Sequence, residues 1–199
     1  TQNAASIVVA THLGQPEPTN PDPALSTKVL LAWFAQHEYN ITFAATPAEA
    51  SALLKAGAPL ILLENLRFFL GEQDATLAPA FAASLAALAN CYVTDAFGTL
   101  HRQDTSITLL PRLYRSENRL YGNCIARELA ALESIKTAPK KPFAAVLGGN
   151  KLTTKIPLIH ELITAPTAQR ITHLLLGGRL GMALDTTAPD LTALAKQYN

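Results

Sequence analysis

Short apolar runs alternate along this chain with longer stretches whose apolar residues recur at helical spacing. Six of the runs are strand candidates, at residues 7–10, 41–43, 60–63, 92–94, 143–147 and 172–176. Runs of this length between helical stretches are typical of repeated βα units, in which the strands are buried and parallel. We therefore predict an α/β fold with a parallel sheet and helices on both of its faces.

The stretches between these runs carry three helix signals. Val29, Leu30, Trp33 and Phe34 share one face of a first helix, and Leu77, Phe81, Leu85 and Leu88 recur at helical spacing in another. Pro47 and Glu49 suit the first turn of a third helix, because proline and an acidic side chain both favour that end. Residues 125–135 form a further helical stretch.

The composition indicates a globular protein and excludes a fibre or a disordered chain. Of 199 residues, 49% are hydrophobic and 16% are charged, with a net charge of +1. So small a charge favours neither nucleic acid nor an anionic membrane as a partner. The uncharged run at 75–94 is rich in alanine and holds Pro79, so we do not expect a membrane span. Cys91 and Cys124 form no CxxC motif, which fits reduced thiols in a cytoplasmic protein.

One domain boundary is expected at residues 137–142, a polar and proline-bearing link between a helical stretch and a new strand. Residues 1–136 are numerous enough for a whole domain. Residues 143–199 hold two strand candidates, which is few for an independent α/β domain. We therefore expect the second domain to be incomplete.

Unusual polar residues gather where the predicted strands end. In a parallel sheet the carboxyl ends of the strands share one edge, and ligands bind just outside it. His12, Arg67, His101 and Arg102 could converge there from three loops, and the planar fork of arginine suits phosphate or carboxylate oxygens. The sequence leaves a plainer interpretation open, in which each arginine caps carbonyls or pairs with Glu64 or Asp95.

A second cluster follows the last two strands. Gly148 and Gly149 allow the backbone to pass close to a ligand, and Lys151 and Lys155 lie one helical turn apart. Gly177 and Gly178 follow the next strand. The spacing matches neither GxxxxGK[ST] nor GxGxxG. A tight turn with two solvated lysines is the alternative.

Taken in order, these motifs closely resemble those of the phosphoglycerate kinase family. The resemblance rests on residues 63–68 (LENLRF), Gly71-Glu72, residues 95–99 (DAFGT) with His101-Arg102, and residues 141–143 leading into Leu147-Gly148-Gly149 and Lys151. Residues 11–14 are similar to an early substrate loop of that family, and residues 126–129 to the helix that joins its two lobes.

The resemblance implies a Rossmann-like, two-lobed kinase of glycolysis that reversibly transfers a phosphoryl group from 1,3-bisphosphoglycerate to ADP. Residues 1–136 would form a complete lobe for 3-phosphoglycerate, 137–142 a hinge, and 143–199 part of a nucleotide lobe. Mg²⁺ would arrive with ATP or ADP, the protein itself would ligate no metal, and an enzyme of this kind would be a monomer acting on small molecules.

The site residues implied by the resemblance fall into three groups. Arg67 and Lys151 are the predicted catalytic residues. The predicted substrate-binding residues are His12, Gly14, Gln15, Arg67 and Arg102. The predicted nucleotide-binding residues are Gly148, Gly149, Lys151, Lys155, Gly177 and Gly178.

Departures from the family pattern support a second interpretation. Gln15 stands where an arginine is expected, which removes one positive charge from the anion site. The opening strand with an Arg-x-Asp-x-Asn motif would precede Thr1, and further nucleotide-lobe strands would follow Asn199. The alternative is a catalytically inactive relative of the kinase that serves as a structural or anion-binding subunit. The glycine spacing disfavours a third interpretation, an unrelated Rossmann-type dinucleotide-binding protein.

Overall fold

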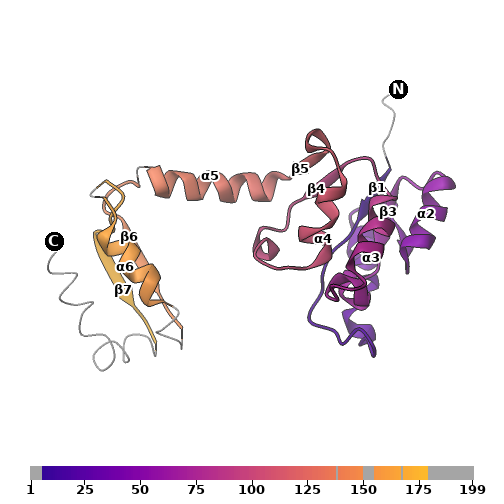
Figure 1. Ribbon diagram of the computed structural model, residues 1–199, viewed down its shortest axis with the longest axis horizontal. Helices are drawn as coiled ribbons and strands as arrows, with labels where there is room; N and C mark the ends of the chain where they lie inside the picture. Colours follow the sequence, from indigo (N-terminus) through magenta and orange to yellow (C-terminus); the bar gives the residue numbers. More distant parts are fainter. Residues whose placement is uncertain (1–5, 138, 150–154, 167, 179–199) are drawn as a thin grey trace. The chain divides into compact units, whose positions relative to one another are not determined.

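The computed structural model describes residues 6–137, 139–149, 155–166 and 168–178 (Figure 1). The chain divides into two compact units, Thr1–Ile125 and Ala126–Asn199. Their limit falls within one helix, α5 (Asn123–Thr137). The assignment of 1–136, 137–142 and 143–199 to a substrate lobe, a hinge and a partial nucleotide lobe stays a prediction.

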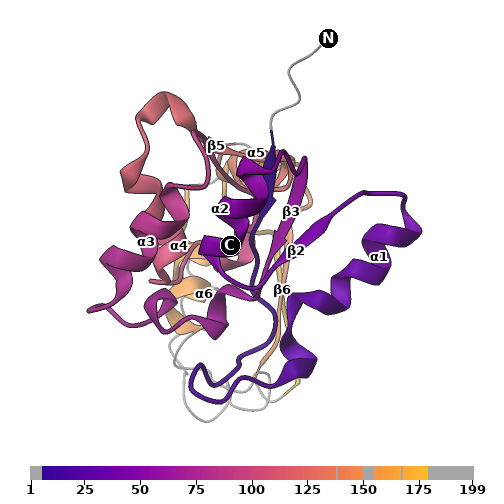
Figure 2. The same cartoon turned by 90° about the vertical axis from the view of Figure 1, so that its right-hand side faces the viewer.

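A three-stranded parallel sheet organises the first unit, in the order β1 (Ile7–Val9), β3 (Leu60–Leu63) and β2 (Thr42–Ala44). These strands lie side by side (Figure 2). In the register of the sheet, Val8 is opposite Ile61 and Phe43 is opposite Leu62. The central strand β3 is a continuous apolar run because both of its faces are covered. Leu62 and its two neighbours in β3 are 0% exposed, so this strand forms the core of the unit.

A second parallel pair joins β4 (Tyr92–Thr94) to β5 (Arg119–Tyr121). The sequence analysis missed β5, because its three residues are all exposed and form no apolar run. Among the described strands, β1 and β4 each pair along one edge only. A cavity of about 380 Å³ is lined by residues of both strands, including Val8 and Val93.

The helices of the first unit follow the sequence signals in most places. Thr46 precedes α2 (Pro47–Lys55), and its hydroxyl accepts a bond of 3.1 Å from the Glu49 amide, so this helix begins as predicted. The remaining helices are α1 (Leu31–Gln36), α3 (Ala78–Ala86) and α4 (Thr105–Thr108), with the 3₁₀ turns η1 (Pro23–Leu25), η2 (Thr27–Leu30), η3 (Leu66–Phe68), η4 (Leu70–Glu72), η5 (Phe97–Thr99), η6 (Leu110–Leu113) and η7 (Ser116–Asn118).

The apolar face expected on the first helix is only partly covered. Trp33 is 51% exposed and stacks on His37, whose ring centroid lies 4.1 Å away. In α3, by contrast, Leu85 is buried in the core of the first unit, with Phe81 packed against that core, as the spacing predicts.

The second unit, described by itself, holds the parallel pair β6 (Ala144–Leu147) and β7 (His173–Leu176). Helix α6 (Ile156–Thr164) buries Ile159 and Ile163 in a small cluster with Ile171. The fold is therefore α/β with parallel strands, as predicted. No helix in the described parts of the chain is both long and apolar enough to cross a bilayer.

Candidate anion-binding site

Asn65 joins the loop after β3 to the loop after β1. Its side chain is 0% exposed, and its Nδ2 donates to the carbonyls of Leu13 at 2.7 Å and Leu25 at 2.9 Å. Its Oδ1 accepts from the amides of Leu13 at 3.2 Å and Arg67 at 3.1 Å. This one amide therefore fixes the backbone on which two predicted site residues, His12 and Arg67, are mounted.

Glu64 secures the same strand end from the other side. Its carboxylate accepts from the Ser26 hydroxyl at 2.6 Å, from the Thr27 amide and hydroxyl at 2.8 and 3.2 Å, and from the Asn65 amide at 2.7 Å. Burial raises the pKa of the Glu64 carboxyl, but these hydrogen bonds outweigh burial, and the pKa lies below its ordinary value. Glu64 is thus committed to the fold and is not the partner of Arg67.

Arg67 is a buried cation, and one of its buried donor atoms has no partner in the described residues. The residue is 9% exposed, and its NH1 donates to the carbonyl of Gly14. Gly14 has φ +60°, and a Cβ there would lie 2.6 Å from Leu25, so this close approach requires glycine. The Nε of Arg67 is buried and has no partner within the described residues. A buried donor without a partner is costly, so it points to a ligand atom.

Arg102 comes from the loop after β4 and meets Arg67 at a shared carboxylate. Its Nε donates to Asp104 at 2.8 Å, while the NH2 of Arg67 lies 3.7 Å from the same oxygen. Burial raises the pKa of the Asp104 carboxyl. Hydrogen bonds from Arg102 and Gln73 and the charges of Arg102 and His12 lower it by more, so the pKa lies below its ordinary value. Asp104 is therefore an ionised group between two arginines.

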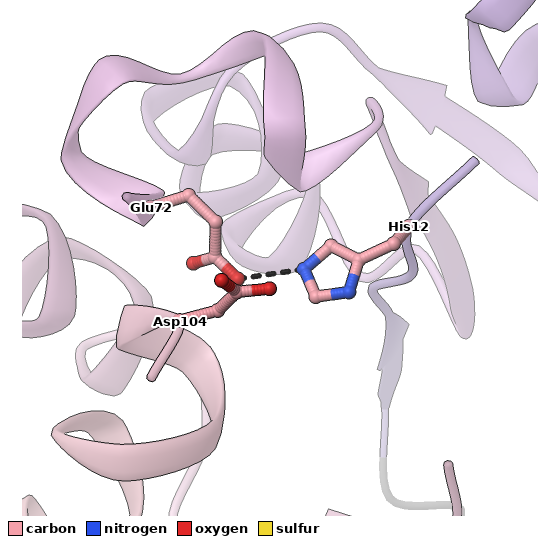
Figure 3. Close-up of side chains that lie close together, drawn as sticks. All are labelled: His12, Glu72 and Asp104. Carbon is pink, nitrogen blue, oxygen red and sulfur yellow. Dashed lines mark hydrogen bonds and ion pairs between the residues drawn. The ribbon is translucent and has the colours of Figure 1, made fainter. Parts of the chain in front are cut away.

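His12 completes the cluster and is held by Glu72 (Figure 3). Its Nε2 donates to Glu72 at 2.6 Å, and Glu72 also accepts from the hydroxyl and amide of Ser106 at 2.5 and 3.1 Å. Glu72 is 0% exposed. A carboxylate only accepts, so the Nε2 atom of His12 carries the hydrogen.

The ligand atoms of His12, Glu72 and Asp104 lie within 4.8 Å of one another, a spacing that a metal ion could use. The guanidinium groups of Arg67 and Arg102 beside Asp104 would repel a divalent cation. We therefore assign these carboxylates to holding His12 and the two arginines. The absence of a protein-bound metal stays a prediction.

The structure thus brings His12, Arg67 and Arg102 together from three loops, with the Gly14 carbonyl beside them. Gln15 is exposed, and so is His101, which makes no described contact with this cluster. Asp95 accepts from the Ile125 amide at 3.0 Å and is not the partner of an arginine in the cluster.

Sequence reasoning missed Glu72 and Asp104 as parts of this site. Glu72 was noted only as part of a family motif, and Asp104 was not singled out. The position of Asp104, two residues after Arg102, was the available signal.

In the second unit, the two glycine pairs lie at one sheet edge. Leu147 is opposite Leu176 in the parallel pair, so Gly148-Gly149 and Gly177-Gly178 follow adjacent strand ends. All four glycines are exposed, and a Cβ on any of them would meet no atom of the described residues within 4 Å. Lys155 is half-buried and stands just before α6, not within it. Lys151 lies outside the described residues.

Comparisons with known proteins agree on one family. The sequence model of the family described as phosphoglycerate kinase matches residues 1–188. The chain is 34% identical over 184 residues to a phosphoglycerate kinase of Chlamydia trachomatis, a match covering 89% of this chain and 44% of that protein. A phosphoglycerate kinase of Rhodopirellula baltica is 33% identical over 204 residues, covering 96% of this chain and 50% of that protein.

Among solved structures, phosphoglycerate kinase from Coxiella burnetii is similar with a TM-score of 0.71 and 26% identity. That match covers 98% of this chain and 50% of the other. The chain therefore spans about half the length of the relatives that it matches.

Proposed function

Since this chain belongs to the phosphoglycerate kinase family, we propose that its first unit binds 3-phosphoglycerate for reversible phosphoryl transfer between 1,3-bisphosphoglycerate and ADP. His12, Arg67 and Arg102 are the proposed contacts to the substrate. Gly14 shapes the loop, and Gln15 lies at its exposed end.

The buried Nε of Arg67 is the observation that carries this proposal. It is a charged donor without a partner in the described residues, in a side chain that is 10% exposed. A phosphate or carboxylate oxygen is the acceptor that suits this atom, and the proposal requires the side chains that cover Nε to move when the ligand enters. Arg102 and His12 add donors from two other loops, so three cationic or donor groups surround one small anion.

The proposed nucleotide site uses the glycine edge of the second unit. The open space over Gly148, Gly149, Gly177 and Gly178 allows phosphate groups to approach the backbone, and Lys155 supplies a positive charge nearby in sequence. This arrangement fits ADP or ATP. Mg²⁺ bound with the nucleotide neutralises phosphate charge, and we assign no residue of this chain as its ligand.

The catalytic contribution of the chain follows from the character of phosphoryl transfer, which depends on positioning and on stabilising charge at the phosphoryl oxygens. We propose that Arg67 orients the substrate and stabilises this charge from the first unit. Lys151 is the proposed counterpart in the second unit. The substrates are small molecules, and the enzyme is proposed to act as a monomer.

A second candidate is an inactive relative of the kinase that binds anions without transferring a phosphoryl group. Two observations favour it. Gln15 carries no charge, and Asp104 places a negative charge among the cations of the site. A coupled assay for ATP formation from 1,3-bisphosphoglycerate, on the native full-length product, separates the two candidates.

Calorimetric titration with 3-phosphoglycerate tests the binding site itself. Arg67→Ala removes a charge-assisted contact, and we expect a loss of about 1.5–3 kcal/mol, on the order of ten- to hundredfold in affinity. Arg115→Ala is the matched control, because the Arg115 side chain is 82% exposed and pairs with the exposed Glu117. Equal binding by the parent and Arg67→Ala, or no binding by either, contradicts the proposed site.

A further inference from the structure

Asp104 stands where a helix cap is expected but does not act as one. It precedes α4 with φ −62° and ψ 145°, a backbone conformation suited to an N-cap residue, yet its side chain accepts no hydrogen bond from the helix. Glu72 accepts from the Ser106 amide of that helix instead, at 3.1 Å. The start of α4 is therefore held from another segment, and the Asp104 carboxylate is free to face the arginines.

That carboxylate occupies donors that an incoming anion needs. Asp104 is 5% exposed, its Oδ2 accepts from Arg102 Nε at 2.8 Å, and the NH2 of Arg67 lies 3.7 Å away. An anionic ligand between these arginines would meet a carboxylate of the same sign. We infer that Asp104 is an internal counter-anion of the site, which competes with bound ligand for Arg102 and limits how much negative charge the site accepts.

The two arginines differ in their freedom to exchange partners. The side chain of Arg102 is 29% exposed, whereas that of Arg67 is 10% exposed and is tied to the Gly14 carbonyl. Arg102 is therefore the group that turns from Asp104 to the ligand. Arg67 stays tied to the Gly14 carbonyl.

The charge balance of the cluster explains why this competition affects specificity. The charges of Arg67 and Arg102 are matched by the carboxylates of Glu72 and Asp104, which leaves His12 as the only other ionisable side chain of the cluster. The depressed pKa of Asp104 keeps its carboxyl ionised at neutral pH. Of two anions that fit the same space, a site so balanced favours the one that carries fewer negative charges.

The inference rests on the proposed function, because it concerns the same site. Asp104→Asn keeps the shape of the side chain and removes the charge, and its effect is measured by calorimetric titration with 3-phosphoglycerate and, separately, with inorganic phosphate. We expect both ligands to bind about tenfold more tightly or better, because a like charge near the ligand is removed. Glu117→Gln is the control, since it changes the net charge equally at a side chain that is 55% exposed.

The direction of the change decides between two roles for Asp104. If Asp104 instead holds the arginines in a binding-ready position, Asp104→Asn weakens binding. Weaker or unchanged binding by Asp104→Asn therefore overturns the proposal that Asp104 is a counter-anion. Asp104→Ser, with a short side chain suited to the start of a helix, repeats the test if the asparagine variant does not fold.

Failure of the proposed function gives a different result. If both proteins unfold cooperatively on heating but neither binds either ligand, the proposed anion-binding site is refuted. The role of Asp104 as a counter-anion is then refuted as well. If the parent binds and Asp104→Asn does not bind more tightly, only the counter-anion is refuted. Binding by the variant alone supports the counter-anion.

Discussion

Replacing Glu72 with glutamine should destabilise the first unit. It should also move the hydrogen of the neutral His12 imidazole from Nε2 to Nδ1. Glu72 Oε2 accepts from the Ser106 amide, and Oε1 accepts from the Ser106 hydroxyl and from His12 Nε2. The backbone N–H of Ser106 can only donate, so the one oxygen of the new glutamine side chain must occupy the Oε2 position. The new NH₂ group then faces the serine hydroxyl and the imidazole.

The magnitude follows from these contacts. Hydrogen bonds to a charged group contribute about 1.5–3 kcal/mol, and neutral ones about 0.5–1.5 kcal/mol. All three bonds to the buried carboxylate become bonds to a neutral amide, and in two of them the serine hydroxyl and the imidazole must act as acceptors. We therefore expect the free energy of unfolding to fall by about 2–3 kcal/mol.

Urea unfolding followed by circular dichroism measures the loss, with Glu117→Gln as the control that changes an exposed carboxylate. Nitrogen-15 NMR of the imidazole measures the second effect. We expect the hydrogen on Nε2 in the parent and on Nδ1 in Glu72→Gln. A change in unfolding free energy below about 0.5 kcal/mol, the range of ordinary surface substitutions, would refute the role given to Glu72.

Two further predictions concern Glu64 and Gln15. Because the pKa of Glu64 lies below its ordinary value of 4.5, the stability it contributes is complete above that value and is lost as pH falls below it. Urea melts at decreasing pH should show this loss in the parent and a shallower decline in Glu64→Gln; equal slopes would contradict it. Gln15→Arg should tighten 3-phosphoglycerate binding by restoring a positive charge at the site, and a calorimetric titration with unchanged affinity would place Gln15 outside the pocket.

Several parts of this fold could be predicted because their signals are local. The run Leu60–Leu63 is continuously apolar since β3 is covered on both faces, and Pro47 begins α2 because its fixed φ suits a first helical turn. Strand β5 could not be found in this way. Its residues Arg119–Tyr121 are exposed, and only pairing with β4 makes them a strand.

The candidate site shows the same division. The prediction that Arg67 and Arg102 converge needed only that each follows a predicted parallel strand, although β3 and β4 lie in separate sheets of the structure. The roles of Glu72 and Asp104 depend on which buried carboxylate faces which cation. The pairing of Glu72 with His12 depends on packing among η4, α4 and the loop after β1, whereas the spacing of Asp104 and Arg102 was the one available signal for their pairing.

The central claim is that a small anion binds between His12, Arg67 and Arg102. NMR of the chain labelled with nitrogen-15 arginine, titrated with 3-phosphoglycerate, observes the unpartnered Arg67 Nε directly. We predict saturable shifts of the side-chain signals of Arg67 and Arg102, with the exposed Arg115 unchanged. Unmoved Arg67 and Arg102 signals at saturating ligand, or shifts confined to exposed arginines, would contradict the account.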